Sequence, residues 1–441
     1  MDDPEVSAQM RDDWNARARE DAGYYVAFGR RDQDDAEFFA TATDTINGLE
    51  TELRRIPIAE RSGWKALEIG CGPGRLMRPM SRHFVEIHGV DVSDEMIVLA
   101  REKLHDIPNA YPHVGSGSSL AQFTDDSFDF VYSYAVFQHI PSRDVVFEYL
   151  REIRRVLKPG GLARLQFNGL PRDLGDSYNT WAGARFSSSD LMEFTESQNF
   201  QVLALDGTAT QYMWTTWRKR PREWRVEEEL STAETQDGKL PTRIRRITNA
   251  SSTEPVAPSR GRFASISLWI ENLPEETGLH ELRVMVGDSF GTIVYIGPPD
   301  SCQMQQVVTI LPELEATGLL PVELQREGRV IAPLATLRII PPGPLVPRVQ
   351  SIRDGIHLVA ENRIETRHVK MLIEELSRPN EIEVAVGGYP VADLEYFCVD
   401  PRPQRFEVNF RLPESIAPGR HALEMRIGRR KFAPVMLEVV A

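Results

Sequence analysis

The chain has 441 residues, of which 41% are hydrophobic and 26% charged, a composition typical of globular proteins with sizeable cores. Its formal net charge is −14, and an acidic protein is repelled by phosphate backbones, so we expect no nucleic-acid partner. No apolar run approaches the ~20 residues that cross a bilayer, and the acidic start lacks the apolar core of a secretory signal, so we expect a cytoplasmic protein without a membrane partner.

The first half of the chain alternates strand and helix patterns. Buried strand patterns lie at residues 64–70, 85–91, 111–114, 128–133 and 162–167. Helical patterns lie at residues 93–104, 142–157 and 187–198, and Ser142 is placed as an N-cap. Two further strand patterns, 200–205 and 211–217, flank Asp206-Gly207, which is typical of a hairpin turn. This order predicts an α/β fold with a seven-stranded, mostly parallel sheet and an antiparallel hairpin at its edge.

The second half consists of short alternating strands from about Pro241 onward. It contains an internal repeat, because several short motifs return about 100 residues later. The repeated motifs are Leu311-Pro312-Glu313, Gly318 and Ala332-Pro333, which return as Leu412-Pro413-Glu414, Gly419 and Ala433-Pro434. Two such units fit tandem β-sandwiches and resemble bacterial immunoglobulin-like modules.

These patterns predict five segments along the chain. They are a helical extension at 1–60, an α/β domain at 61–225, a linker at 226–240, and β-sandwich repeats at 241–343 and 344–441.

A glycine-rich turn follows the first strand, at residues 68–74 with the sequence EIGCGPG. Glycines there allow the backbone to approach a ligand closely. A nicotinamide-binding turn wants Gly or Ala at its sixth position, where this chain has Arg75. A P-loop needs Gly-Lys followed by Ser or Thr, which is missing here. Both of these nucleotide-binding motifs are therefore disfavoured.

The turn instead resembles the first motif of class I S-adenosylmethionine-dependent methyltransferases. Further elements follow in that family's order: Asp91 ends the second strand, and residues 93–101, 127–133, 138–141 and 155–161 match later motifs. The resemblance covers roughly residues 10–220. It implies a Rossmann-like fold, S-adenosyl-L-methionine as cofactor and methyl transfer as the activity.

The resemblance also assigns cofactor contacts to matching positions. They are Glu68, Gly70, Cys71, Gly72, Gly74, Asp91, Val92, Met96, Gly117, Ser118, Ser133 and Tyr134. Glu68 and the Gly70 backbone would hold the methionine ammonium, and Asp91 the ribose hydroxyls. The alternative for Asp91 is a cap on the following helix. Gly117 stands where relatives often carry an Asp for the adenine amino group, so backbone groups and Ser118 would substitute.

Other expectations have a stated alternative. Cys71 is expected to be a packing residue, because methyl transfer from a sulfonium is a direct displacement. His139, just past the fourth strand, would take a proton from the acceptor, or would only hydrogen-bond a carbonyl and fix its loop. The aromatic residues that would line a pocket, or pack in the core, are Trp181, Tyr212, Trp214 and Trp217. The N-terminal segment would cover the cofactor cleft and exclude water, or would be a plain packing extension.

No metal is expected. The cysteines, Cys71, Cys302 and Cys398, lie far apart in the sequence, a spacing that does not match metal ligands and suits a reducing compartment. The fourth-strand region lacks the clustered acids that hold magnesium.

We therefore expect a methyltransferase acting on a small-molecule or sugar-like acceptor. The alternative is a cofactor-binding scaffold whose β-sandwiches bind a glycan or protein partner, although the intact glycine-rich turn and Asp91 argue against decay of the catalytic domain.

Overall fold

The computed structural model describes residues 4–27, 31, 33–56, 61, 63–170, 178–208, 210–220, 241–343, 347–356, 362–376, 378–400 and 404–440. They form two compact units, one of residues 1–15 and 43–343 and one of residues 16–42 and 344–441. The predicted linker at 226–240 lies outside the described residues. None of the helices in these ranges is long and apolar enough to cross a membrane.

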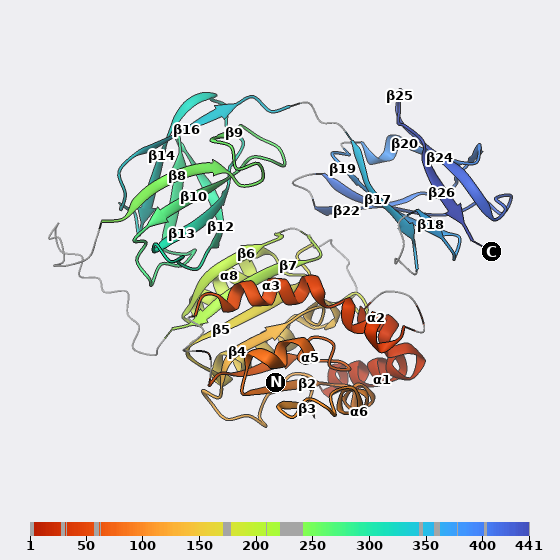
Figure 1. Cartoon of the computed structure of the whole chain (residues 1–441), viewed down its shortest axis with the longest axis horizontal. Helices are drawn as coiled ribbons and strands as arrows, with labels where there is room; N and C mark the ends of the chain where they lie inside the picture. The colour runs from red at the N-terminus through yellow and green to blue at the C-terminus, as the bar shows by residue number, and fades with distance from the viewer. Residues whose placement is uncertain are drawn as a thin grey trace. The chain divides into compact units, whose positions relative to one another are not determined.

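A mixed sheet forms the centre of the α/β part of the first unit (Figure 1). Its strands are β1 (Lys65–Ile69), β2 (Glu86–Asp91), β3 (Ala110–Val114), β4 (Phe128–Ser133), β5 (Leu157–Phe167), β6 (Phe200–Asp206) and β7 (Met213–Lys219). Their order is β3-β2-β1-β4-β5-β7-β6. The first five strands are parallel, and β7 runs antiparallel to both β5 and β6. The predicted Rossmann-like mixed sheet with an antiparallel hairpin is confirmed, but the hairpin is not at a free edge, because β6 also pairs with a strand of the second half.

The described helices of the first half of the chain precede β1 or connect the strands of this sheet along the sequence. They are α1 (Pro4–Ala27), α2 (Asp35–Ala40), α3 (Thr43–Leu53), α5 (Met77–Met80), α6 (Asp94–Lys103), α7 (Arg143–Val156) and α8 (Ser188–Ser197). Short 3-10 turns are η1 (Ser81–His83), η2 (Phe137–His139) and η3 (Pro379–Glu381). The α1 helix contributes its residues up to Asn15 to the first unit.

The α7 helix shows how local sequence sets an element's ends. Its N-cap is Ser142, as predicted, and the serine side chain accepts a hydrogen bond from the Val145 backbone N–H. The helix ends at Val156, one residue before the end of the helical pattern predicted at 142–157, and β5 already begins at Leu157. The reason is that Lys158 precedes Pro159, and a residue before proline is pushed out of the helical region.

The second half contains β8 to β26, and the internal repeat is visible in its elements. The first copy has β8 (Arg243–Asn249), β9 (Val256–Pro258), β10 (Ser265–Glu271), β11 (Leu282–Val286), β12 (Ser289–Ile296), β13 (Met304–Ile310), β14 (Gly318–Arg326), β15 (Arg329–Val330) and β16 (Ala335–Ile340). The second has β17 (Arg348–Asp354), β18 (Arg363–Ile364), β19 (His368–Glu374), β20 (Ile382–Val386), β21 (Tyr389–Pro390), β22 (Glu395–Asp400), β23 (Arg405–Arg411), β24 (Gly419–Ile427), β25 (Arg430–Lys431) and β26 (Val435–Val439).

The two copies share their strand plan. The equivalent strands β13 and β23 have 7 residues each, and β14 and β24 have 9 each. A short parallel pairing, β9 with β16 and β18 with β26, recurs in both copies. The β-rich character of this half is confirmed, whereas its assignment to sandwiches of immunoglobulin-like type stays a prediction.

The first β repeat continues the α/β sheet at its β6 edge. The β12 strand pairs antiparallel with β6, and the Leu279 backbone N–H donates to the Val202 carbonyl at 2.8 Å. A buried ion pair joins Arg220, just past β7, to Glu281 at 2.6 Å. The α/β domain and the first β repeat therefore belong to one compact unit.

Candidate active site

The glycine-rich turn between β1 and α5 adopts a backbone that only glycine accommodates well. Gly70, Gly72 and Gly74 have φ angles of 68°, 50° and 84°, in the left-handed region where other residues are strained. A Cβ on Gly70 would lie 2.2 Å from a methyl carbon of Val136. The turn therefore leaves bare backbone facing the loop that follows β4.

Glu68 is a buried acid at the foot of this turn. Its side chain is 3% exposed and accepts a hydrogen bond from the Tyr132 hydroxyl at 2.9 Å. Burial raises the pKa of Glu68 to about 8, and the Tyr132 hydrogen bond only partly offsets this. A buried carboxyl of this kind is suited to gain a cation, such as the α-ammonium of S-adenosylmethionine. The residues present therefore fit the cofactor that the motif implies.

Asp91 lies opposite the turn, at the end of β2. Its carboxylate accepts the backbone N–H groups of Gly72 and Ser93, each at 2.9 Å. Burial raises the pKa of Asp91, while these two hydrogen bonds lower it. The cap of α6 is Ser93, whose hydroxyl accepts the Met96 N–H at 3.1 Å, so the helix already has its side-chain cap. The ribose role of Asp91 stays a prediction.

Other predicted contacts lie around the same turn. Cys71 is buried, and burial raises the pKa of its thiol well above the usual value, which disfavours the thiolate that a nucleophile needs. Met96 is buried in the first turn of α6. Ser133 is buried and donates its hydroxyl to the Ile69 carbonyl at 3.1 Å. Tyr134 is half-buried and stacks on Trp214.

The loop after β3 carries the predicted adenine contacts. Gly117 has φ 100°, and a Cβ there would lie 3.0 Å from the Ser7 hydroxyl of α1. Ser118 is buried. Glycine at this position lets α1 pack directly on the loop, which gives a physical reason for the missing acid.

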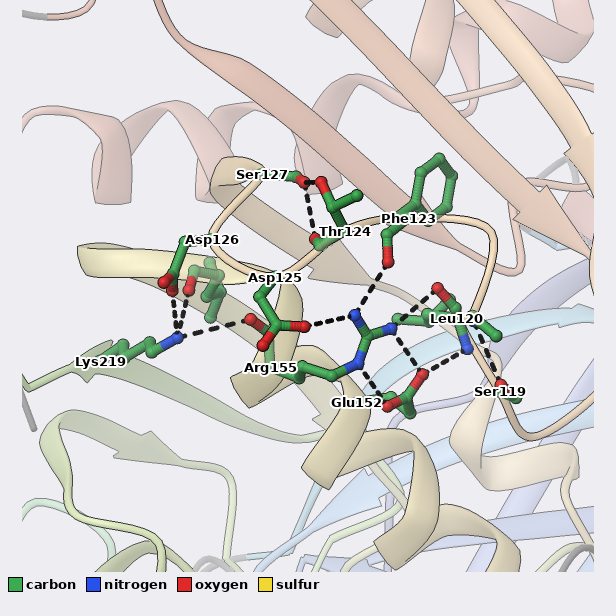
Figure 2. A network of polar contacts seen from close by, with 12 residues as sticks. Ser119, Leu120, Phe123, Thr124, Asp125, Asp126, Ser127, Glu152, Arg155 and Lys219 are labelled. Carbon is green, nitrogen blue, oxygen red and sulfur yellow. Dashed lines mark hydrogen bonds and ion pairs between the residues drawn. The ribbon is translucent and has the colours of Figure 1, made fainter.

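Figure 2 shows the polar network that holds the rest of this loop. Arg155, near the end of α7, donates to the carbonyls of Phe123 and Leu120 at 2.8 and 3.0 Å. It also pairs with Asp125 at 2.9 Å and with Glu152 at 2.7 Å. Hydrogen bonding to Glu152 raises the pKa of Arg155 further. The arginine of the last predicted motif thus ties the loop to α7.

The N-terminal helix crosses the same edge of the sheet. Arg11 donates to the carbonyls of Val92 and Gly115, both at 3.2 Å. The Asn15 side-chain oxygen accepts the Ser93 hydroxyl at 2.6 Å. The sequence analysis missed Arg11 and Asn15, because polar residues on a helix give no signal of a partner about 80 residues away. These contacts pack the first part of α1 against the loops after β2 and β3, and its role as a cover stays a prediction.

His139 lies in η2, between two tryptophans. Its ring centroid is 5.4 Å from that of Trp14 and 5.3 Å from that of Trp181. Its Nδ1 lies 2.7 Å from the Trp181 carbonyl, and since a carbonyl only accepts, Nδ1 carries the proton in the neutral ring. The lone pair is then on Nε2, 3.2 Å from the side-chain nitrogen of Gln138. The hydrogen bond from Nδ1 to the Trp181 carbonyl is the loop-fixing bond. The unprotonated nitrogen, Nε2, faces the side chain of Gln138.

A further residue missed by the sequence analysis is Gln166, fully buried near the end of β5. Its side-chain oxygen accepts the Ala135 N–H at 2.9 Å, and its nitrogen donates to Gln138 at 3.1 Å. Ala135 has a φ of 56°, so this amide supports a strained backbone just past β4. In the sequence, Gln166 is one polar residue in an otherwise mainly apolar strand pattern, and that pattern does not show that its side chain is buried.

A cavity of about 270 Å³ opens beside the post-β4 loop. Its lining residues are Asp44, Thr45, Gly48, Leu49, Tyr134, Arg164, Tyr212 and Trp214. Tyr212 and Trp214 thus line a pocket, whereas Trp217 is buried in the core and Trp181 lies beside His139. The pocket alternative therefore holds for Tyr212 and Trp214, and the core alternative holds for Trp217.

Among the described residues, no group of three or more His, Cys, Asp or Glu side chains is placed to hold a metal ion. The absence of metal stays a prediction.

Known proteins resemble the first half of the chain. Residues 67–165 match the family model described as "Methyltransferase domain". Phosphoethanolamine N-methyltransferase 2 of Caenorhabditis elegans is 32% identical over 143 residues, which are 32% of either chain. Demethylmenaquinone methyltransferase of Staphylococcus aureus is 34% identical over 105 residues, 23% of this chain and 42% of the relative.

A solved methyltransferase from Methanosarcina mazei is 22% identical, with a TM-score of 0.30, over 37% of this chain and 98% of that one. The chain spans less than half the length of the two curated relatives it matches. The matched region contains the glycine-rich turn, Asp91 and the post-β4 loop, and the fold and motifs agree with the match. Residues 67–165 are therefore part of a class I S-adenosylmethionine-dependent methyltransferase domain.

Proposed function

We propose that this chain transfers a methyl group from S-adenosylmethionine to a small-molecule acceptor. The observation that carries the proposal is the buried carboxyl of Glu68 at the foot of the glycine-rich turn. A cavity with aromatic lining residues, among them Tyr134, lies beside the loop after β4. The first feature suits the cationic cofactor, and the second suits an organic acceptor. Ligands of open α/β sheets bind at this carboxyl edge of the strands.

The cofactor supplies a methyl carbon made electrophilic by its sulfonium. The acceptor's nucleophilic atom bonds to that carbon while the carbon–sulfur bond breaks and its electron pair stays on sulfur. The chain's residues mainly hold the reactants in line. The α1 contacts made by Arg11 and Asn15 exclude water from the site, which favours reaction of charged groups.

The acceptor proton leaves to a base or to water. His139 is the proposed base, acting through Nε2 because Nδ1 is held by the Trp181 carbonyl. A fixed tautomer of this kind is typical of histidines that accept protons. In this proposal Gln138 gives up its contact with Nε2 when the acceptor binds.

The acceptor's chemical class is the open part of this proposal. The relatives are named for a nitrogen acceptor, phosphoethanolamine, and for demethylmenaquinone. A sugar-like acceptor is the further expectation from the sequence. Full-length protein incubated with cell extract and S-adenosylmethionine carrying a labelled methyl group, followed by untargeted mass spectrometry, would identify the acceptor.

A binding experiment tests the cofactor half independently. Titration calorimetry with S-adenosylhomocysteine should give micromolar affinity, and NAD should not bind. Asp91→Ala should weaken binding at least ~10-fold, because charge-assisted hydrogen bonds contribute about 1.5–3 kcal/mol each. Asp94→Ala, an exposed acid three positions later, is the matched control. Unchanged affinity in a folded Asp91→Ala protein contradicts the ribose assignment.

The alternative proposal is a scaffold that binds a glycan or protein through its β repeats. One observation favours it: β22 is an edge strand with exposed Tyr396 and Phe397. Cofactor binding without transfer of label to any extract component would favour this alternative. Transfer of label to a small molecule contradicts it.

A further inference from the structure

Arg75, the residue that excludes a nicotinamide-binding turn, is a buried cation next to the glycine-rich turn. It directly follows Gly74, the last glycine of the turn, and is only 5% exposed. Burial lowers the pKa of the Arg75 guanidinium, yet an arginine keeps its charge in proteins. Because burying a charge costs free energy, a cation at this place in the turn needs a physical reason.

The Arg75 guanidinium lies between the turn and the loop after β4. Its central carbon is 5.5 Å from the centroid of the Tyr134 ring, and Tyr134 directly follows the last residue of β4. Its positive charge also lowers the pKa of Glu68, whose carboxyl accepts its hydrogen bond from the Tyr132 hydroxyl at 2.9 Å. A buried carboxyl and a buried guanidinium are therefore near each other where β1 and β4 end.

This pair of opposite charges complements one part of the cofactor. The methionine group of S-adenosylmethionine carries an ammonium and a carboxylate on the same carbon atom. Glu68 is suited to the ammonium, which leaves the carboxylate for a neighbouring cation. Arginine binds carboxylates through two parallel hydrogen bonds, and such a contact is stronger in a buried site than in water. Arg75 has the charge and the location for this contact.

The other arginines near the site have partners elsewhere. Arg11 donates to carbonyls of the loops after β2 and β3. Arg155 holds the segment between β3 and β4 through two carbonyls. Arg164 donates to the Thr216 hydroxyl at 2.9 Å and lines the cavity beside the loop after β4. Among these described arginines, Arg75 is the one that is adjacent to the glycine-rich turn and acts on Glu68.

We propose that Arg75 binds the carboxylate of the cofactor's methionine group and makes the site selective for cofactors that carry this carboxylate. This inference rests on the proposed methyltransferase function and names the residue that determines cofactor specificity. Glu68 and Arg75 together recognise the two charges of the methionine group. A decarboxylated cofactor keeps the ammonium and the adenosine, but it loses the contact with Arg75 and brings a net positive charge toward the guanidinium.

The test compares two ligands that differ in this carboxylate alone. Binding of S-adenosylhomocysteine and of decarboxylated S-adenosylhomocysteine (S-adenosyl-3-thiopropylamine) to the full-length protein is measured by titration calorimetry. We expect the wild-type protein to bind S-adenosylhomocysteine at least ~10-fold tighter, because a charge-assisted hydrogen bond is lost with the carboxylate. Equal affinity for the two ligands overturns the proposal.

Variants then assign the preference to Arg75. Arg75→Gln should weaken S-adenosylhomocysteine at least ~10-fold and change the affinity for the decarboxylated ligand by less than about threefold. Arg75→Lys keeps the charge but loses the planar fork, so it should keep part of the preference. Arg78→Gln is the matched control. Arg78 lies three positions later and donates to the Lys103 carbonyl at 2.8 Å and to Asp106 at 2.7 Å. Its loss should change both affinities by less than about twofold.

The ratio of the two affinities separates recognition from a structural role. If Arg75→Gln weakens both ligands equally, or keeps the wild-type preference, the assignment is wrong. Melting temperatures without ligand show which variants are folded, and if Arg75→Gln is not, a reduced preference in Arg75→Lys supports the proposal and an unchanged preference overturns it. Failure of the wild-type protein to bind S-adenosylhomocysteine contradicts the methyltransferase proposal and this inference together, whereas binding without preference contradicts this inference alone.

Discussion

The two β repeats have the same strand plan but different surroundings. In the first, β12 pairs with the α/β sheet through Tyr295 and Ala204. In the second, the equivalent strand β22 is an edge strand with Tyr396 and Phe397 exposed. The same pattern, a tyrosine followed by a large apolar residue, therefore pairs with the α/β sheet in the first repeat, at Tyr295. In the second repeat it is exposed, at Tyr396 and Phe397.

The ion pairs differ in the same way. Glu281 and Glu381 each stand directly before an equivalent strand, β11 or β20. Glu281 pairs with Arg220 with side chains 10% and 9% exposed, whereas Glu381 pairs with Arg378 with side chains 39% and 69% exposed. A buried pair becomes costly when one partner is removed, and an exposed pair contributes little. The burial of the ion pair, which differs between Glu281 and Glu381, therefore determines how much each glutamate contributes to stability.

The largest expected effect comes from cutting the chain. A protein of residues 1–225 would expose the β6 edge, including buried Leu203 and Leu205, and open edges with apolar side chains aggregate. A protein of residues 1–343 keeps the first repeat on β6 and should aggregate less than the 1–225 protein, since both proteins equally lack residues 344–441, which form one unit with residues 16–42. Size-exclusion chromatography of both proteins decides this, and a soluble, cofactor-binding 1–225 protein would show that the joint is dispensable.

The next effect compares the two glutamates directly. Glu281→Gln should lower the free energy of unfolding by about 3–5 kcal/mol, because it leaves the Arg220 guanidinium buried without its charge partner. Glu381→Gln should change it by less than about 1 kcal/mol. Urea unfolding measures both, and similar losses in the two variants would contradict the assigned difference in burial.

The tyrosines give a smaller contrast. Arg55 lies over the Tyr295 ring at 5.3 Å and donates to the Ile296 carbonyl at 2.5 Å. Tyr295→Ala should remove the contact between Arg55 and the Tyr295 ring and lower the free energy of unfolding by about 1–3 kcal/mol. Tyr396→Ala should change the free energy of unfolding by less than about 0.5 kcal/mol. Melting temperatures of the two full-length variants provide the measurement. A larger loss for Tyr396→Ala would mean that the second repeat has a partner surface of its own.

The sequence predicted what depends on local pattern. The seven strands, the Ser142 cap and the glycine turn all follow from periodicity and from residues with special backbone preferences. The repeat was visible because its motifs recur at a fixed spacing. These features need only neighbours along the chain.

The missing features depend on long-range packing. Arg11 and Asn15 act on loops about 80 to 100 residues away, and Gln166 supports a loop from a neighbouring strand. The pairing of the first repeat with β6 is likewise invisible, because Glu281 and Glu381 are each followed by an aliphatic residue, a charged residue and Val. One sequence gives no measure of which of two similar surfaces is covered.

The smallest expected effect concerns the buried carboxyl of Glu68. Glu281 forms an ion pair with Arg220, whereas Glu68 accepts a hydrogen bond from the Tyr132 hydroxyl. This bond and the charge of Arg75 only partly offset burial, which raises the pKa of Glu68 to about 8. A carboxyl whose folded pKa is raised is protonated in the folded state and ionised in the unfolded state between pH 4.5 and 8. Glu68 therefore costs the cofactor-free protein increasing stability as the pH rises through that window.

Cofactor binding should relieve this cost, because the incoming ammonium stabilises the carboxylate. We expect the affinity for S-adenosylhomocysteine to rise about fivefold from pH 7 to pH 8, with close to one proton released per molecule bound at pH 7. Calorimetry in two buffers of different ionisation enthalpy measures the proton directly. Glu68→Gln should abolish the release while Glu281→Gln keeps it, because Glu281 pairs with Arg220 at the junction with the first β repeat and not with the cofactor turn. Full proton release in Glu68→Gln would assign the titration to another group, and Asp91, whose pKa is also raised by burial, would be the next residue to substitute.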